Sequence, residues 1–175
     1  MRRLAEADRI RSFMRALGAG APPETRVYFT GGVSAVLMGW RAATIDVDVS
    51  FVPDRDELLR LLPALKNDLE LNIELASPAD FVPELPGWEE RSRFIAREGN
   101  ASFYHYDFYA QALAKIERGH AQDQADVRSM LEARLVEPTR LRDLFDSVEP
   151  RLFRYPALDP KALRRALGEA LSGRG

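Results

Sequence analysis

Residues 26–51 read RVYFTGGVSAVLMGWRAATIDVDVSF, and this stretch decides the fold. Its first five residues, 26–30, are rich in β-formers and predict a strand. A pair of glycines and the small, apolar residues 33–40 follow, which indicates a tight turn and a short helix. Residues 44–51 then alternate apolar with polar side chains. This alternation predicts a second strand with one acidic face.

The acidic face carries two aspartates, Asp46 and Asp48. Side chains two residues apart on a strand lie on the same face, so the two carboxylates are expected close together. Aspartate is disfavoured in strands, and like charges disfavour each other's ionised forms. A cation relieves both costs, and Mg²⁺ suits one or two carboxylates together with waters and substrate phosphates. The alternative interpretation is a solvent-facing edge strand whose acids bind nothing.

The glycine pair, Gly31 and Gly32, is expected at the beginning of the short helix. Glycines there allow backbone amides to approach an anion closely, and the helix dipole favours negative charge. The short helix is also long enough to bring the next strand back beside the first. These features predict a phosphate site next to the aspartates, with a plain tight turn as the alternative.

The remaining patterns extend the fold in both directions from this stretch. Together they predict an α/β (α+β) protein, with a mixed sheet flanked by helices and a C-terminal helical part. Residues 1–109 are expected to form the core with an N-terminal helix, and residues 110–175 a helical part packed on it as one compact unit. The expected further elements are an N-terminal helix in 1–16, a helix from 53, a strand at 70–76, a loop at 77–90, hairpin arms at 92–98 and 101–109, and helices at 110–118, 123–133, 139–147 and 160–171.

Composition restricts the possible chemistry. The chain has 175 residues, a net charge of -2, no cysteine and two histidines. Disulfides, thiolate zinc sites and a cysteine nucleophile are therefore excluded, and any metal would be a hard cation held by oxygens. The first 16 residues lack the apolar core of a secretory signal, and no stretch is long enough to cross a membrane. A cytoplasmic protein without membrane contact is the expectation.

The glycine pair followed by RAATIDVD at 41–48 resembles the signature of minimal nucleotidyltransferases of the DNA polymerase β superfamily and of AbiEii-type bacterial proteins. The resemblance implies a nucleotidyltransferase-like sheet with a third acid on the next strand, which by position is Glu74, with Asp107 as a fallback. The superfamily's usual serine after the first glycine is replaced here by Gly32. The hydroxyl nearest the phosphates therefore comes from Thr30 or Ser34, or is absent.

A second stretch, residues 114–126 (AKIERGHAQDQAD), resembles a helical region of AbiEii-type and related families. In those relatives the lysine is thought to contact nucleotide phosphates, and the aspartates help to shape the site. The resemblance thus implies that Lys115 and Asp123 belong to the nucleotide site. From the residues alone, Lys115 is interpreted as a solvated helix residue, and Asp123 is equally the N-cap of its helix or a site residue.

Together, these features and the resemblance imply a metal-dependent nucleotidyltransferase that moves a nucleoside monophosphate from a nucleoside triphosphate to a protein or RNA hydroxyl. The expected cofactor is Mg²⁺ or Mn²⁺, and a protein partner in a toxin–antitoxin or phage-defence pair is expected. The alternative is a catalytically idle domain that binds such a partner. The expected site residues are Asp46, Asp48 and Glu74 for catalysis and metal, and Gly31, Gly32, Ser34, Arg41, Thr44, Lys115 and Asp123 for the nucleotide.

The third interpretation of the function is a nucleic-acid-binding module, and it depends on the arginines at 91, 93 and 97. On a strand, these side chains could face one side. No basic stripe interleaved with aromatic residues accompanies them, so sequence-specific DNA binding is not expected.

Overall fold

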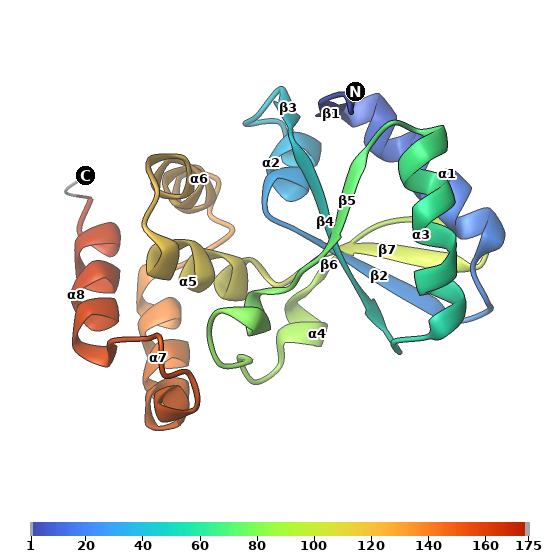
Figure 1. Cartoon of the computed structure of the whole chain (residues 1–175). Helices are drawn as coiled ribbons and strands as arrows, with labels where there is room; N and C mark the ends of the chain where they lie inside the picture. Colours follow the sequence, from blue (N-terminus) through green and yellow to red (C-terminus); the bar gives the residue numbers. More distant parts are fainter. Residues whose placement is uncertain (1, 174–175) are drawn as a thin grey trace. The chain divides into compact units, whose positions relative to one another are not determined.

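The computed structural model describes residues 2–173, which form two compact units (Figure 1). The first unit contains the chain through Ser77 together with Ser92–Tyr106, and the second contains Pro78–Arg91 and the chain from Asp107 onward. The second unit is thus helical, as expected, but it also includes the segment 78–91, which the sequence patterns assign to the core.

The first unit is built on a five-stranded sheet with the strand order β5-β4-β2-β7-β6. Strands β2 and β7 are parallel, as are β4 and β5, whereas β2 is antiparallel to β4 and β6 is antiparallel to β7. The predicted mixed sheet is therefore confirmed. The strands are β2 (Thr25–Thr30), β4 (Asp46–Val52), β5 (Asn72–Leu75), β6 (Arg93–Glu98) and β7 (Ala101–His105).

Two helices, α1 (Ala7–Gly20) and α3 (Asp56–Asp68), pack on one face of this sheet (Figure 1). Both helices bury an apolar stripe against the apolar positions of the strands. Removing this apolar surface from water is the main stabilising term for the unit. The buried residues include Ile10, Phe13, Met14, Leu17, Val27, Phe29, Val47, Val49, Leu58, Leu62, Ile73 and Phe103.

A two-stranded ribbon of β1 (Ala5–Glu6) and β3 (Ala43–Thr44) was not expected. Its antiparallel register pairs Ala5 with Thr44. The first helix consequently begins at Ala7, because the residues before it are extended against β3. The helix α2 (Gly32–Met38) joins β2 to this ribbon.

The second arm of the predicted hairpin is shorter than expected, because β7 ends at His105. The helix α5 (Phe108–Arg118) begins three residues later, where Asp107 accepts a hydrogen bond from the backbone N–H of Tyr109, 3.1 Å away. The prediction of a strand through residue 109 was wrong, since this N-cap outweighs the β-propensity of the aromatic residues.

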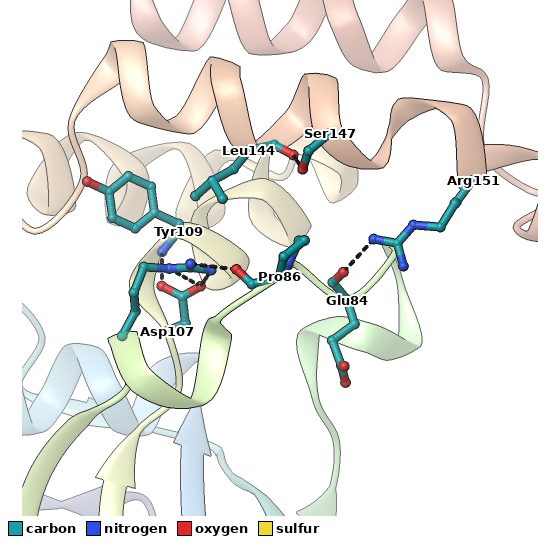
Figure 2. Close-up of polar contacts among 8 residues, drawn as sticks. Glu84, Pro86, Asp107, Tyr109, Leu144, Ser147 and Arg151 are labelled. Carbon is teal, nitrogen blue, oxygen red and sulfur yellow. Dashed lines mark hydrogen bonds and ion pairs between the residues drawn. The ribbon is translucent and has the colours of Figure 1, made fainter.

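The second unit contains the predicted helices and, within 78–91, two short helical turns in place of the expected loop. This segment is tied to the helices by side chains. Arg151 donates to the carbonyl oxygen of Glu84, 3.0 Å away (Figure 2). The elements are η1 (Pro78–Asp80), α4 (Trp88–Arg91), α5, α6 (Ala121–Glu132), α7 (Pro138–Val148), η2 (Glu149–Arg154) and α8 (Pro160–Leu171).

Across residues 2–173, none of the helices combines the length and apolar character that crossing a membrane would require.

Candidate active site

Strand β4 has one apolar and one acidic face, as its sequence predicts. Val47, Val49 and Phe51 are buried, whereas Asp46 and Asp48 are half-buried on the other face. The buried side chains pack with α1 and α3 in the core, so the carboxylates point to the opposite side of the sheet. The acidic face of the strand is therefore confirmed.

The glycine turn lies directly against one of these carboxylates. Gly31 has a φ of 66°, which glycine adopts far more readily than other residues. A Cβ atom added to it would be 2.8 Å from Oδ2 of Asp48. The register of the sheet explains this contact, because Thr30 is the residue of β2 paired with Asp48. The predicted proximity of the glycine turn and the aspartate pair is thus present in the structure.

Gly32 makes an equally close contact, with Thr44 of the β1–β3 ribbon. A Cβ atom at Gly32 would be 2.0 Å from Oγ1 of Thr44 and 3.2 Å from Nη1 of Arg41. The space where a serine side chain would begin at position 32 is therefore filled by the hydroxyl of Thr44. The ribbon brings the hydroxyl of Thr44 to the turn, and the segment before β3 brings the guanidinium of Arg41, although residue 32 carries no side chain of its own.

A side chain at position 32 should destabilise the protein because of this contact. We expect Gly32→Ser to cost about 1–3 kcal/mol of unfolding free energy, the range for overpacking. Thermal unfolding should show a lower Tm for Gly32→Ser and recovery in Gly32→Ser/Thr44→Gly. The control is Gly168→Ala in α8, where nothing lies within 4 Å of the added atom and the Tm should not fall. An unchanged Tm for Gly32→Ser would contradict the contact.

Ser34 lies inside the fold, fully buried on α2. Its Oγ is 3.3 Å from the carbonyl oxygen of Phe29 and 3.0 Å from Nδ1 of His105 at the end of β7. These bonds join α2 to two strands of the sheet. The structure thus gives the Ser34 hydroxyl a role in holding the turn, while a contact of Ser34 with phosphate stays a prediction.

His105 is buried, and burial lowers its pKa to about 4, with a smaller contribution from the positive charge of Arg93. The unfolded chain binds a proton on this histidine below its ordinary pKa of about 6.5, whereas the folded protein does so only near 4. Between these values the unfolded state holds more protons, so stability falls as the pH falls.

We expect His105 to account for about 3 kcal/mol of lost stability between about pH 7 and about pH 4, at 1.36 kcal/mol for each unit of pKa difference. Urea unfolding across this range should show a shallower pH dependence for His105→Gln than for wild type. The matched control is His120→Gln, at the exposed beginning of α6, which should keep the wild-type pH dependence. Equal slopes for wild type and His105→Gln would refute the assignment.

Glu74 lies on the strand next to the aspartates, as predicted, because β4 and β5 pair Asp48 with Glu74 and Asp46 with Asn72. The Nδ2 atom of Asn72 donates to Oδ1 of Asp46 at 2.5 Å and to Oε1 of Glu74 at 2.9 Å. Arg2 in turn donates to Oδ1 of Asn72. Asn72 was not among the residues predicted for the site, although its position two residues before Glu74 places both side chains on one strand face.

The carboxylates on β4 and β5 are the candidate ligands for a magnesium ion. Residues 2–173 contain no group of three or more His, Cys, Asp or Glu side chains arranged to hold a metal. Mg²⁺, however, commonly takes one or two carboxylates and completes its shell with waters and substrate phosphates. The aspartates on β4 fit this mode, in which the nucleotide supplies the remaining ligands.

Lys115 and Asp123 belong to the second unit, where they form a buried ion pair. The Lys115 Nζ atom is 2.7 Å from Oδ2 of Asp126 and 3.3 Å from Oδ1 of Asp123, and all three side chains are at least nine-tenths buried. Arg118 adds a half-exposed partner to Asp123 at 3.3 Å. Lys115 is therefore not a solvated residue, and Asp123 is not the N-cap, since α6 begins after His120. A contact of either residue with a nucleotide stays a prediction.

Asp107 was the alternative to Glu74 as the third acid, and Arg91 was one of the three arginines of the nucleic-acid interpretation. The Asp107 carboxylate caps α5 by accepting a hydrogen bond from the backbone N–H of Tyr109 (Figure 2). It also binds the guanidinium of Arg91, 2.7 Å away, within the second unit. Asp107 is thus engaged within the helical unit, and Glu74 is the acid that the register of the sheet pairs with Asp48. Arg91 lies in α4, so the three arginines of the nucleic-acid interpretation do not share one strand.

A mixed five-stranded sheet with a glycine turn against an aspartate pair defines the class: a nucleotidyltransferase-like α+β protein. Within this class, the chain belongs to the family described as "Nucleotidyltransferase of unknown function (DUF6036)", whose model matches residues 9–155. No curated protein and no solved structure shows a significant match to the chain.

Proposed function

We propose that the protein is a Mg²⁺- or Mn²⁺-dependent nucleotidyltransferase that moves a nucleoside monophosphate from a nucleoside triphosphate to a hydroxyl group on a protein or RNA. The observation that carries the proposal is the contact between the glycine turn and the acidic strand, where Oδ2 of Asp48 lies 2.8 Å from a Cβ built on Gly31. Phosphate bound at the turn would therefore lie next to carboxylates that can hold a cation.

The carboxylates of Asp46 and Asp48 would hold the metal, which when bound supplies charge stabilisation to the phosphates. Their two-residue spacing on β4 places both on the face that α1 and α3 leave uncovered. Glu74, the register partner of Asp48, would accept the proton of the acceptor hydroxyl. Its side chain is more exposed than the aspartates, as an acceptor-facing group requires.

The phosphate end of the nucleotide would be bound by the turn and by Arg41. A guanidinium carries a permanent positive charge and a fork of donors that matches phosphate oxygens. The Nη1 atom of Arg41 lies near Gly32, so the positive charge of Arg41 is at the glycine turn. Thr44 Oγ1 at the same place supplies the hydroxyl that relatives obtain from serine.

The resemblance to AbiEii-type proteins supports a protein partner in a toxin–antitoxin or phage-defence pair. It also supports the second candidate function, a catalytically idle domain that binds such a partner. The specific observations in its favour are the glycine at position 32 and the lack of a three-acid metal group among residues 2–173.

The test is transfer from each of the four α-³²P-labelled nucleoside triphosphates to the protein and RNA of a cell lysate, with Mg²⁺ or Mn²⁺ present. Labelled product that disappears in Asp48→Asn supports the transferase. Nucleotide binding by calorimetry without any transfer supports the idle domain. The absence of both binding and transfer for all four nucleotides would reject the transferase.

A further inference from the structure

The side-chain amide of Asn72 joins two of the carboxylates described above. One N–H group reaches Asp46 on β4 at 2.5 Å, and the same nitrogen is 2.9 Å from Glu74 on its own strand. An amide nitrogen has two hydrogens, so it can donate to both carboxylates at once. Because the amide is neutral and donates to both, it orients the acids without adding charge to the site.

The orientation of this amide is set by a residue outside the sheet. An amide presents donors at one end and an acceptor at the other, and only the nitrogen end can bind carboxylates. Arg2, which has donors but no acceptor, contacts the oxygen end of Asn72. This contact turns the nitrogen end of Asn72 towards the two acids.

Arg2 is held near β5 by its neighbours in the chain. The N–H of Arg3 donates to the carbonyl oxygen of Glu70 at 2.9 Å, and its guanidinium pairs with the Glu70 carboxylate at 3.1 Å. The next residues form β1, which pairs with β3 immediately before the acidic strand. The residues from Arg2 to β1 therefore run from β5 to the ribbon that carries Thr44.

We propose that Asn72 is a positioning residue of the nucleotidyl-transfer site, which holds Asp46 and Glu74 at a fixed separation and is itself oriented by Arg2. This inference rests on the proposed function. Asn72 engages one oxygen of each acid, so the second oxygen of Asp46 serves the cation and that of Glu74 serves the acceptor proton. Groups that orient metal ligands in this way typically contribute 10–100-fold to metal affinity or activity.

The first test measures the binding of Mn²⁺ alone, by electron paramagnetic resonance titration of the full chain without nucleotide. We expect Asn72→Ala to weaken Mn²⁺ binding about 10-fold or more. The matched control is Asn100→Ala in the β6–β7 turn, which loses a hydrogen bond of 3.0 Å to the carbonyl oxygen of Ala21 and should bind Mn²⁺ as wild type does. Wild-type affinity in Asn72→Ala would overturn the inference.

The second test uses Asn72→Asp, which replaces the donor between the acids by a third carboxylate. Like charges should lower the Tm of the metal-free variant, and Mn²⁺ should raise that Tm more than it raises the Tm of wild type. Mn²⁺ binding by Asn72→Asp but not by wild type would support the position of Asn72 between the acids and overturn the role of its amide in cation binding, whereas the proposed function is tested separately by nucleotide transfer. If Mn²⁺ does not raise the Tm of Asn72→Asp, the position of Asn72 between the two acids is overturned.

Discussion

Asp48→Asn should lower the rate of nucleotide transfer by about a thousandfold, the largest effect expected of a single substitution in this protein. The change keeps the size of the side chain and removes the charge that, in the proposed function, would bind the metal beside Gly31. A metal ion supplies several kcal/mol of charge stabilisation in the transition state, and each 1.36 kcal/mol corresponds to a factor of ten. Steady-state transfer from the preferred nucleoside triphosphate measures the effect.

The matched control is Asp54→Asn. Asp54 belongs to the chain's other Asp-x-Asp pair, is exposed, and precedes α3. The two variants change the net charge equally, so a general electrostatic effect would appear in both. Transfer by Asp48→Asn at the wild-type rate would show that the carboxylate has no part in the reaction.

Lys115→Met should lower the free energy of unfolding by about 3–5 kcal/mol, the usual cost of removing one partner of a buried ion pair. The substitution leaves Asp123 and Asp126 buried without the ammonium that lies 3.3 and 2.7 Å from them. In a protein of this size the Tm should fall by on the order of 10 °C. Thermal unfolding followed by circular dichroism measures this change.

Two further variants separate the ion pair from a general effect of losing lysine. Lys161→Met, at the exposed beginning of α8, should unfold near the wild-type temperature. Lys115→Met combined with Asp123→Asn and Asp126→Asn should recover part of the loss, because no buried charge then remains without its partner. If Lys115→Met alone unfolds at the wild-type temperature, the buried pair is not a stabilising contact.

The parts of the fold that follow local periodicity could be predicted from the sequence. Strand β4 was recognisable because a two-residue alternation separates its aspartates from its valines. The resemblance to minimal nucleotidyltransferases implied a third acid on the next strand, and Glu74 lies there, paired with Asp48. The alternation of β4 reports a face that is buried at Val47, Val49 and Phe51, so no knowledge of distant residues is required.

Other features depend on contacts between residues far apart in the sequence. The β1–β3 ribbon has two residues in each strand, which is too short for a periodic signal. The buried charge of Lys115 could not be inferred either, because its helix alone does not show which carboxylates lie opposite. The contact of Thr44 with Gly32 likewise depends on the ribbon and not on either residue's neighbours.

The division of the chain has a practical consequence for dissecting the protein. The polypeptide passes from one unit to the other after Ser77, after Arg91 and after Tyr106. No single cut can therefore release either unit as an uninterrupted fragment. A shortened version with the sheet alone would need a synthetic linker from Ser77 to Ser92 and a stop after Tyr106, since ending translation at Ser77 would remove two of the five strands.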